Sequence, residues 1–324
     1  MKRWERPARP LPLRARPMKN ETVVSYVARL AAANDFPASL LFRTIGDCVP
    51  GKHVLDRDAR LNPAALDRLS VLSRTPAEHL SRTLPTLKSP PQYLPLATDR
   101  PVIRFFRGYP HPVPACRICT LRHGPATAVA WGYRSLHRFV CITHRRWLGD
   151  PPHLDLTAAP EIVTAQSQYA EIAARLGYNA TAKTLVEAWQ VTSRWANEKR
   201  HPALIARWTD RAAAIGAVGP GPGSVRFPEI VRLMEITGNP DWRRHVAMVQ
   251  PPQLDNFYRH IARRIGTEPD AFTTGHGQKD PLSEWVRILR FRFATTRDEF
   301  WRGVHRQPDW RRDPIPFPES CHFE

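Results

Sequence analysis

The sequence predicts a mainly α protein in which a helical N-terminal region, a small β module and a helical C-terminal domain follow one another. Apolar side chains recur at helical spacing on both sides of residues 111–156. Between the two helical parts stand three cysteines and a histidine, in two closely spaced pairs and among short stretches typical of β-strands. The chain has 33 prolines among 324 residues, and they are concentrated where one part gives way to the next.

The composition is strongly basic, with 48 Lys and Arg against 30 Asp and Glu and a net charge of +18. Such a charge favours polyanions, most simply nucleic acid, although an origin in a generally Arg-rich proteome is an alternative explanation. Mean hydropathy is −0.44, and no apolar run approaches the about 20 residues that span a membrane.

The N-terminus is basic but continues with proline and arginine instead of an apolar stretch, so a secretory signal is not predicted, and an Arg-rich transit peptide is the alternative. The five cysteines are an odd number and three of them cluster with a histidine. This pattern suits a metal site in a reducing compartment better than a set of disulfides. We therefore expect a cytoplasmic protein without a membrane anchor.

The N-terminal region begins with a basic, proline-rich arm over residues 1–19, followed by helices. Asn20 is the predicted cap of the first helix, Glu21 suits the positive end of its dipole, and Asn34 ends it. A short helix is predicted over residues 38–45, closed by Gly46.

Two further helices form a closely connected pair before residue 85. Asn62 and Pro63 provide the cap and first residue of one helix. Thr75, Pro76 and Glu78 predict a capping box for a second helix over residues 77–84. The connection has the length found in a helix-turn-helix, so the pair either binds DNA or simply packs within the domain.

The metal-binding motif consists of Cys116-x-x-Cys119, 21 residues, and Cys141-x-x-His144. A two-residue gap lets both side chains of a pair turn toward one tetrahedral ion. Two pairs make a closed Cys₃His set that leaves no position for water, so we predict one structural Zn²⁺. Residues 128–133 and 138–140 are predicted strands that return the second pair to the first, and residues 145–148 a short helix or turn.

The same segment offers alternative ligands and an alternative chemistry. Four neighbouring histidines are alternative ligands: His111, His123, His137 and His153. None of them is separated from Cys141 by two residues, as His144 is. A redox role for Cys116 and Cys119 lacks the βαβ setting of such motifs.

Beyond residue 157 the chain is predicted to be helical, with a Gly- and Pro-rich linker over residues 217–224 and a helix starting at Pro228. Arginines on these later helices are candidates for contacts with DNA phosphates: Arg243, Arg244, Arg259, Arg263, Arg264, Arg287 and Arg290. The predicted organisation is an arm (1–19), a helical N-terminal part (20–110), a zinc module (111–156), a helical region (157–216), a C-terminal helical domain with a possible helix-turn-helix (225–307) and a tail (308–324).

No catalytic arrangement is recognisable. The sequence has neither a P-loop nor a Gly-x-Ser-x-Gly motif, and Asp99, Asp150 and Asp155 do not form a two-metal pattern. We therefore expect a protein that is not an enzyme.

Two blocks of sequence resemble proteins of the TniQ family. The first is Leu11-Pro12-Leu13-Arg14 followed by Glu21-Thr22-Val23-Val24-Ser25-Tyr26-Val27-x-Arg29-Leu30-Ala31-x-x-Asn34. The second consists of Cys116, Cys119, Leu121, Trp131, Cys141, His144 and Leu148. The resemblance covers about residues 10–150. Four positions or segments depart from the family pattern: Asn20, Tyr26, Arg117 and Arg122-His123-Gly124. None of these departures removes a predicted metal ligand.

This resemblance implies a non-enzymatic role in DNA transposition. TniQ-like proteins, including the related TnsD target selectors, help to select or mark the insertion site and engage an AAA+ ATPase that recruits the transposase. Their fold combines helix-turn-helix elements with zinc-ribbon-like modules. The partners implied here are DNA, the AAA+ ATPase and the transposase or another targeting complex. The alternative is a stand-alone zinc-containing regulator of transcription, and a protein-interaction scaffold is a third hypothesis.

Overall fold

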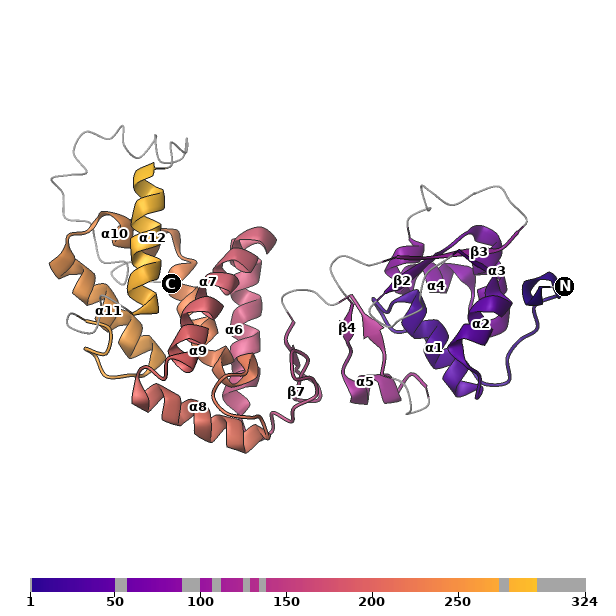
Figure 1. Cartoon of the computed structure of the whole chain (residues 1–324), viewed down its shortest axis with the longest axis horizontal. Coiled ribbons are helices and arrows are strands. Elements are labelled where there is room, and N and C mark those ends of the chain that lie inside the picture. The colour runs from indigo at the N-terminus through magenta and orange to yellow at the C-terminus, as the bar shows by residue number, and fades with distance from the viewer. Residues whose placement is uncertain are drawn as a thin grey trace. The chain divides into compact units, whose positions relative to one another are not determined.

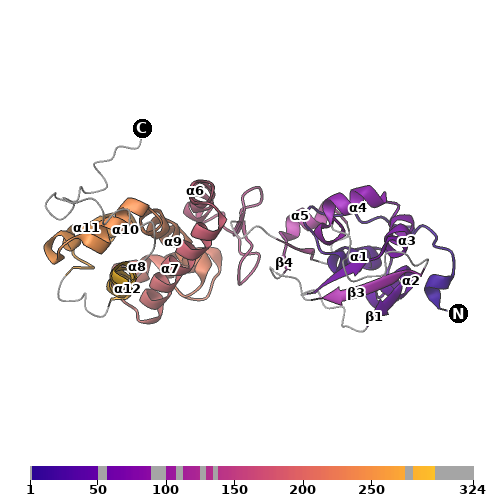
Figure 2. The same cartoon turned by 90° about the horizontal axis from the view of Figure 1, so that it is seen from above.

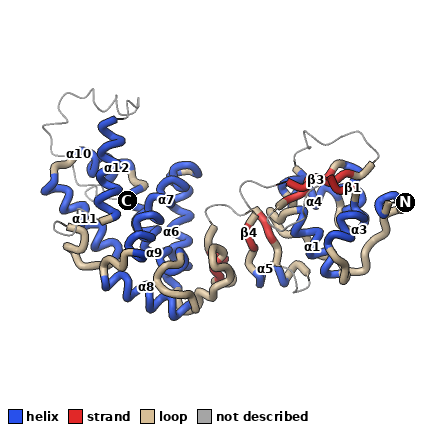
Figure 3. The backbone as a smooth tube through the Cα atoms, viewed as in Figure 1, coloured by secondary structure: helices blue, strands red, loops and turns tan. Residues whose placement is uncertain are grey.

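The computed structural model describes residues 2–49, 57–88, 100–106, 112–124, 129–133, 138–273 and 280–295. It divides into two compact units, Met1–Leu148 and Gly149–Glu324 (Figure 1). Helices dominate both units, and the strands gather in the first (Figure 3). The described residues therefore confirm the predicted mainly α fold. Within these residues, every helix is too short or too polar to cross a bilayer.

Four helices build the N-terminal part of the first unit: α1 (Val23–Ala33), α2 (Ala38–Ile45), α3 (Pro63–Ser73) and α4 (Ala77–Thr83). Asn62 caps α3 as predicted, because its side chain accepts a hydrogen bond from the Ala65 amide at 3.1 Å. The predicted caps of α1 and α4 are wrong. Thr22 caps α1, while Asn20 adopts a left-handed conformation with φ 65°. Pro76 precedes α4 without a side-chain cap.

A three-stranded sheet, which the sequence analysis did not predict, completes this part. Its strands are β1 (Asp47–Val49), β2 (Asp58–Leu61) and β3 (Val102–Phe106), with β3 in the centre, parallel to β1 and antiparallel to β2. Along β3 the side chains alternate, since Ile103 and Phe105 are buried and Arg104 is exposed. This period of two is the signal that could have identified the strand.

The arm is part of the first unit and not a free extension. The Leu11 amide donates to the Leu72 carbonyl at 3.0 Å, and Asn34 exchanges two side-chain hydrogen bonds with the Leu13 backbone. Ala15 and Pro17 are buried. The arm contains one short 3-10 helix, η1 (Arg3–Glu5), and its course is fixed by hydrogen bonds to α1 and α3 and the residues that follow them.

The second unit is a bundle of helices around α9 (Gly223–Thr237). Helices α6, α7, α8, α10 and α11 all pack on α9, and α12 lies beside α7 (Figure 2). Their bounds are α6 (Pro160–Leu176), α7 (Tyr178–Asn197), α8 (Pro202–Ile215), α10 (Pro240–Met248), α11 (Pro251–Ile265) and α12 (Pro281–Thr295). The helices on the two sides of the Gly- and Pro-rich segment therefore share one core.

Helix α9 begins earlier than its sequence predicts, at Gly223 instead of Pro228. The first turn is held by burial, because Val225 and Phe227 are both fully buried. Gly223 lies directly against the ring of Trp189, and a Cβ atom placed there would stand 2.0 Å from the ring. The predicted linker therefore ends where this close packing begins.

We predict that Gly223→Ala destabilises the second unit by about 1–3 kcal/mol, because the added methyl group must displace the Trp189 ring. The midpoint of urea unfolding measures the effect. Gly221→Ala is the matched control, since a Cβ atom at Gly221 meets nothing within 4 Å. Equal midpoints for the two variants would contradict the packing argument.

Candidate metal centre

The first pair of candidate ligands stands on a strand-helix turn. Strand β4 (Val113–Pro114) pairs antiparallel with β5 (Trp131–Gly132) and leads into the short helix α5 (Arg117–Leu121). Cys116 immediately precedes α5 and Cys119 lies within it. The helical turn brings both sulfur atoms to the same side.

The second pair stands on a β-hairpin made by β6 (Val140–Cys141) and β7 (Arg146–Trp147). His144 lies in the turn, where its amide donates to the Cys141 carbonyl at 3.2 Å. The sequence analysis expected a short helix or turn over residues 145–148, but Arg146 and Trp147 form a strand. Stacking of Trp147 on Phe139 across the hairpin, at 5.7 Å between ring centroids, accounts for the difference.

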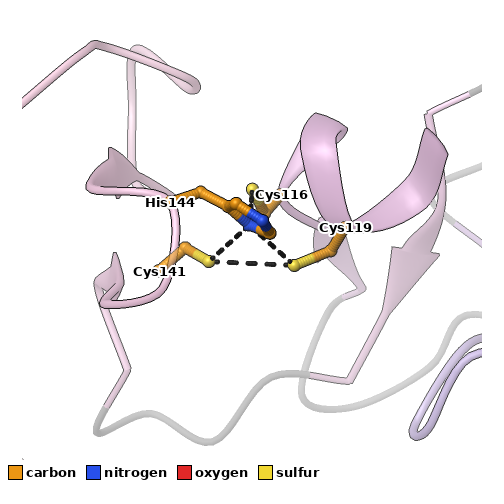
Figure 4. A group of neighbouring side chains, drawn as sticks. All are labelled: Cys116, Cys119, Cys141 and His144. Carbon is orange, nitrogen blue, oxygen red and sulfur yellow. Dashed lines mark hydrogen bonds between the residues drawn. The ribbon is translucent and has the colours of Figure 1, made fainter. Parts of the chain in front are cut away.

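The four predicted ligands converge, with all their donor atoms within 4.8 Å of one another. His144 Nδ1 lies 3.6 Å from Cys116 Sγ, 3.2 Å from Cys119 Sγ and 3.5 Å from Cys141 Sγ. The sulfur atoms of Cys119 and Cys141 are 3.8 Å apart. Figure 4 shows the two pairs facing each other from separate turns of the chain.

These separations fit a tetrahedral metal ion. Usual Zn–S and Zn–N bond lengths place two sulfur ligands about 3.8 Å apart, and a sulfur and a nitrogen about 3.6 Å apart. The donor set is three thiols and one imidazole, a combination that prefers zinc among common divalent ions. The cluster can therefore hold one metal ion, with all four positions supplied by the protein.

The electrostatics of the cluster call for a cation. Burial, together with the neighbouring Cys141 and Cys116, raises the pKa of the Cys119 thiol to about 12. Burial likewise raises the pKa of Cys116. Three crowded thiolates are unfavourable without a positive charge between them, and a divalent ion supplies that charge. Metal binding here must release protons, so affinity should fall as the pH falls.

Of the alternative histidine ligands, His123 and His153 lie outside the cluster of donor atoms. His111 and His137 fall outside the described residues.

A buried polar network fastens this metal-binding module to the helical part of the first unit. Glu21 and Arg29 form an ion pair at 2.7 Å, with their side chains 0% and 2% exposed. Arg29 also donates to the carbonyls of Arg16, at 2.8 Å, and His123, at 3.3 Å. Ser25 donates to Glu21 at 2.8 Å and accepts from the Trp131 amide at 2.8 Å.

The sequence analysis did not assign this role to Glu21, Ser25 or Arg29. From the sequence, Glu21 was expected at a helix dipole, Ser25 to pack inside the first helix, and Arg29 was only a position of family resemblance. Ser25 and Arg29 lie four residues apart on α1, and Glu21 precedes Ser25 by the same interval just before the helix. This regular spacing is the signal that could have linked them.

A second contact joins the same segments through Asp58. Its Oδ1 accepts from the Val23 and Ala59 amides at 2.8 and 2.7 Å, and its Oδ2 accepts from the Tyr133 hydroxyl at 2.9 Å. Burial raises the pKa of the Asp58 carboxyl to about 6. Burial and the carboxylate together raise the pKa of Tyr133.

The raised pKa of Asp58 predicts a pH-dependent stability. The folded value of about 6 lies above the reference value of 3.8, so the folded state holds this proton more tightly. The contribution of Asp58 to stability is therefore largest in acid and declines as the pH rises toward about 6. Relative to Asp58→Asn, which stays neutral, the wild-type free energy of unfolding should fall by about 1 kcal/mol between pH 5 and pH 7.

Urea unfolding of both proteins at each pH measures this difference, and the comparison cancels the acid sensitivity of the metal site. The exposed Asp67 on α3 provides a control in Asp67→Asn. A difference between wild type and Asp58→Asn that does not change with pH contradicts the prediction.

The arginines predicted to contact DNA lie on the helices of the second unit, in different environments. Arg243 pairs with Glu187 at 2.9 Å, Arg259 pairs with Asp270 at 3.0 Å, and Arg264 pairs with Glu235. Arg290 donates to the carbonyls of Val246 and Val249. Arg244 is half-buried, whereas Arg263 and Arg287 are exposed. Three of the seven arginines therefore already form ion pairs with carboxylates of the protein.

Comparison with known proteins bears on the first unit. Residues 12–148 match the sequence model of the family described as TniQ. The matched segment contains both the four-ligand cluster and the Glu21–Arg29 network. No curated protein and no solved structure matches the chain.

Proposed function

We propose, from the premise that residues 12–148 are a TniQ-family domain, that this protein selects or marks the target site in DNA transposition. In this role it links target DNA to an AAA+ ATPase and a transposase, and it performs no chemistry itself. The match to the TniQ family supports a role as a transposition accessory associated with DNA.

We further propose that the cluster of Cys116, Cys119, Cys141 and His144 holds one Zn²⁺. When bound, the ion supplies the positive charge that keeps the three thiolates together. The protein residues do the rest: the α5 turn and the β6–β7 hairpin position the donors, and the Glu21–Arg29 network fixes the module on α1. A closed donor set supports a structural and not a catalytic site.

The observation that carries the proposed function is the family match, which spans nearly the whole first unit. The strong net charge of +18 supports an association with nucleic acid. The exposed Arg263 and Arg287 remain candidates for DNA contacts from the second unit.

A targeted-insertion assay tests the function. The gene is deleted in cells that carry the transposase and the AAA+ ATPase of the same element, and insertions are mapped by sequencing. We expect insertion at the preferred site to be lost and restored by the wild-type chain, and the ATPase to co-purify with it. Unchanged insertion sites, together with altered expression of unrelated genes, would instead favour the transcriptional regulator.

A further inference from the structure

A basic groove lies on the surface of the first unit, and none of its residues is among the arginines predicted to contact DNA. It is a hollow of about 700 Å³ between the arm, the turn from α3 to α4 and the segment after α5. Five cationic side chains line it: Arg14, Arg16, Lys19, Arg74 and Arg122. All five are exposed. We call this surface the basic groove.

The charge of the basic groove is uncompensated. Its lining contains no Asp or Glu, and none of the five cations has an ion pair with an acidic residue in the part of the chain that the structure describes. The contrast is with Arg243, Arg259 and Arg264 in the second unit, each of which faces a carboxylate. A concave surface lined by positive charges alone concentrates the electrostatic field and attracts a polyanion.

The walls of the groove are held in place by the buried network. The Arg16 amide donates to the His123 carbonyl at 2.9 Å, which ties the arm to the segment after α5. The buried Arg29 guanidinium donates hydrogen bonds to the carbonyls of both residues. Arg74 caps α3 in a left-handed conformation with φ 52°, which fixes its backbone at the turn. The backbones that carry these cations are ordered before any ligand arrives, and this lowers the entropic cost of binding.

The chemistry of the lining favours the phosphates of a duplex. Besides the cations it offers the rings of His79 and His123, whose N–H groups are suited to phosphate oxygens. The described residues that line it include no Phe, Tyr or Trp. Proteins that bind single strands stack the bases on aromatic side chains, and the groove has none to offer.

We propose that the basic groove binds the phosphate backbone of duplex DNA, so that the TniQ domain itself holds the target DNA. This inference rests on the proposed function for the choice of DNA as partner. Since only the backbone is contacted, the groove binds duplexes of any sequence and positions the domain without selecting a base sequence. Sequence selection then belongs to another surface or to a partner.

The test measures binding of the full-length, zinc-loaded protein to a labelled duplex of random sequence by fluorescence anisotropy over a series of salt concentrations. The groove variant combines Arg14→Gln, Arg74→Gln and Arg122→Gln. We expect its Kd to rise by roughly 10- to 100-fold at low salt, and the slope of log K against log salt to become shallower by about 3. The three changed side chains are exposed, so zinc content and thermal midpoint should stay at the wild-type values.

The matched control removes three exposed charges elsewhere, through Arg9→Gln, Arg43→Gln and Arg175→Gln. A control that weakens binding as much as the groove variant overturns the proposal, because net charge alone would then explain the affinity. An unchanged salt slope in the groove variant overturns it as well. Tighter binding of a single strand than of the duplex, lost in the groove variant, assigns the groove to single strands and overturns the duplex assignment.

The targeted-insertion assay separates this inference from the proposed function. Wild-type DNA affinity in the groove variant, with insertion still dependent on the protein, rejects the groove alone. Loss of affinity in the groove variant, with insertion sites unaffected by deletion of the gene, rejects the transposition role and leaves the groove standing.

Discussion

Replacing Cys141 with alanine should abolish metal binding and unfold residues 112–148. The sulfur of Cys141 is buried between Cys119 and His144, and its loss leaves three donors for an ion that needs four. The binding free energy of a structural zinc is about 10–16 kcal/mol, as large as the whole stability of a typical domain, and it is part of the folding free energy. We expect elemental analysis to give about one zinc per wild-type chain and none for the variant.

Hydrogen exchange shows which segments lose their structure. Amides of β4, α5, β6 and β7 should lose protection in Cys141→Ala and in chelated wild-type protein, while those of α6 to α9 keep it. Cys48→Ala is the control, because Cys48 is half-buried in β1 and stands outside the cluster. Wild-type zinc content in Cys141→Ala would remove Cys141 from the site, and wild-type protection in the chelated protein would remove the structural role.

Replacing Arg29 with methionine should destabilise the first unit by about 3–5 kcal/mol, because it leaves the Glu21 carboxylate buried without its partner. Arg29 also bonds the carbonyls of Arg16 and His123. Its loss should therefore loosen the arm and the segment after α5 together. Urea unfolding measures the change in free energy, and hydrogen exchange at Arg16 shows the loss of its bond to His123.

A double-mutant cycle identifies the source of the effect. Adding Glu21→Gln to Arg29→Met removes the stranded charge, so the double variant should be more stable than the sum of the single changes predicts. Lys2→Met breaks the exposed pair of Lys2 with Asp47 in the same unit and should cost less than about 1 kcal/mol. Additive losses in the cycle would show that the pair is not coupled.

Local signals in the sequence identified much of the fold. Asn62 before Pro63 marks the start of α3, and α6 and α8 end at Gly177 and Gly216. The short helix α5 was not predicted, and α9 begins earlier than predicted. These signals work because a cap or a helix-ending glycine acts on its own turn of backbone. The metal cluster was predictable for a similar reason, since a two-residue gap within each pair already limits where the donors can point.

Contacts between distant segments were not predictable in the same way. Gly223 and Ser224 look like linker residues, yet they form the first turn of α9, where Trp189 of α7 packs against Gly223 and Ser224 is fully buried. Strand β3 has a local signal in its alternating side chains, but its place between β1 and β2 depends on pairing with distant segments. In both cases burial against a remote partner outweighs the local preference.

The sequence by itself determined the helical composition, the four residues of the Cys–His cluster and the match of residues 12–148 to the TniQ family, because all three depend on residue type and short spacing. Only the tertiary structure decided that Glu21 and Arg29 bury a charge pair between the arm and the metal module. It also decided which cations stay free, pairing Arg243 with Glu187 and leaving the five of the basic groove exposed. Whether a charge is available depends on the distance to the nearest opposite charge in space, and that distance is set by folding.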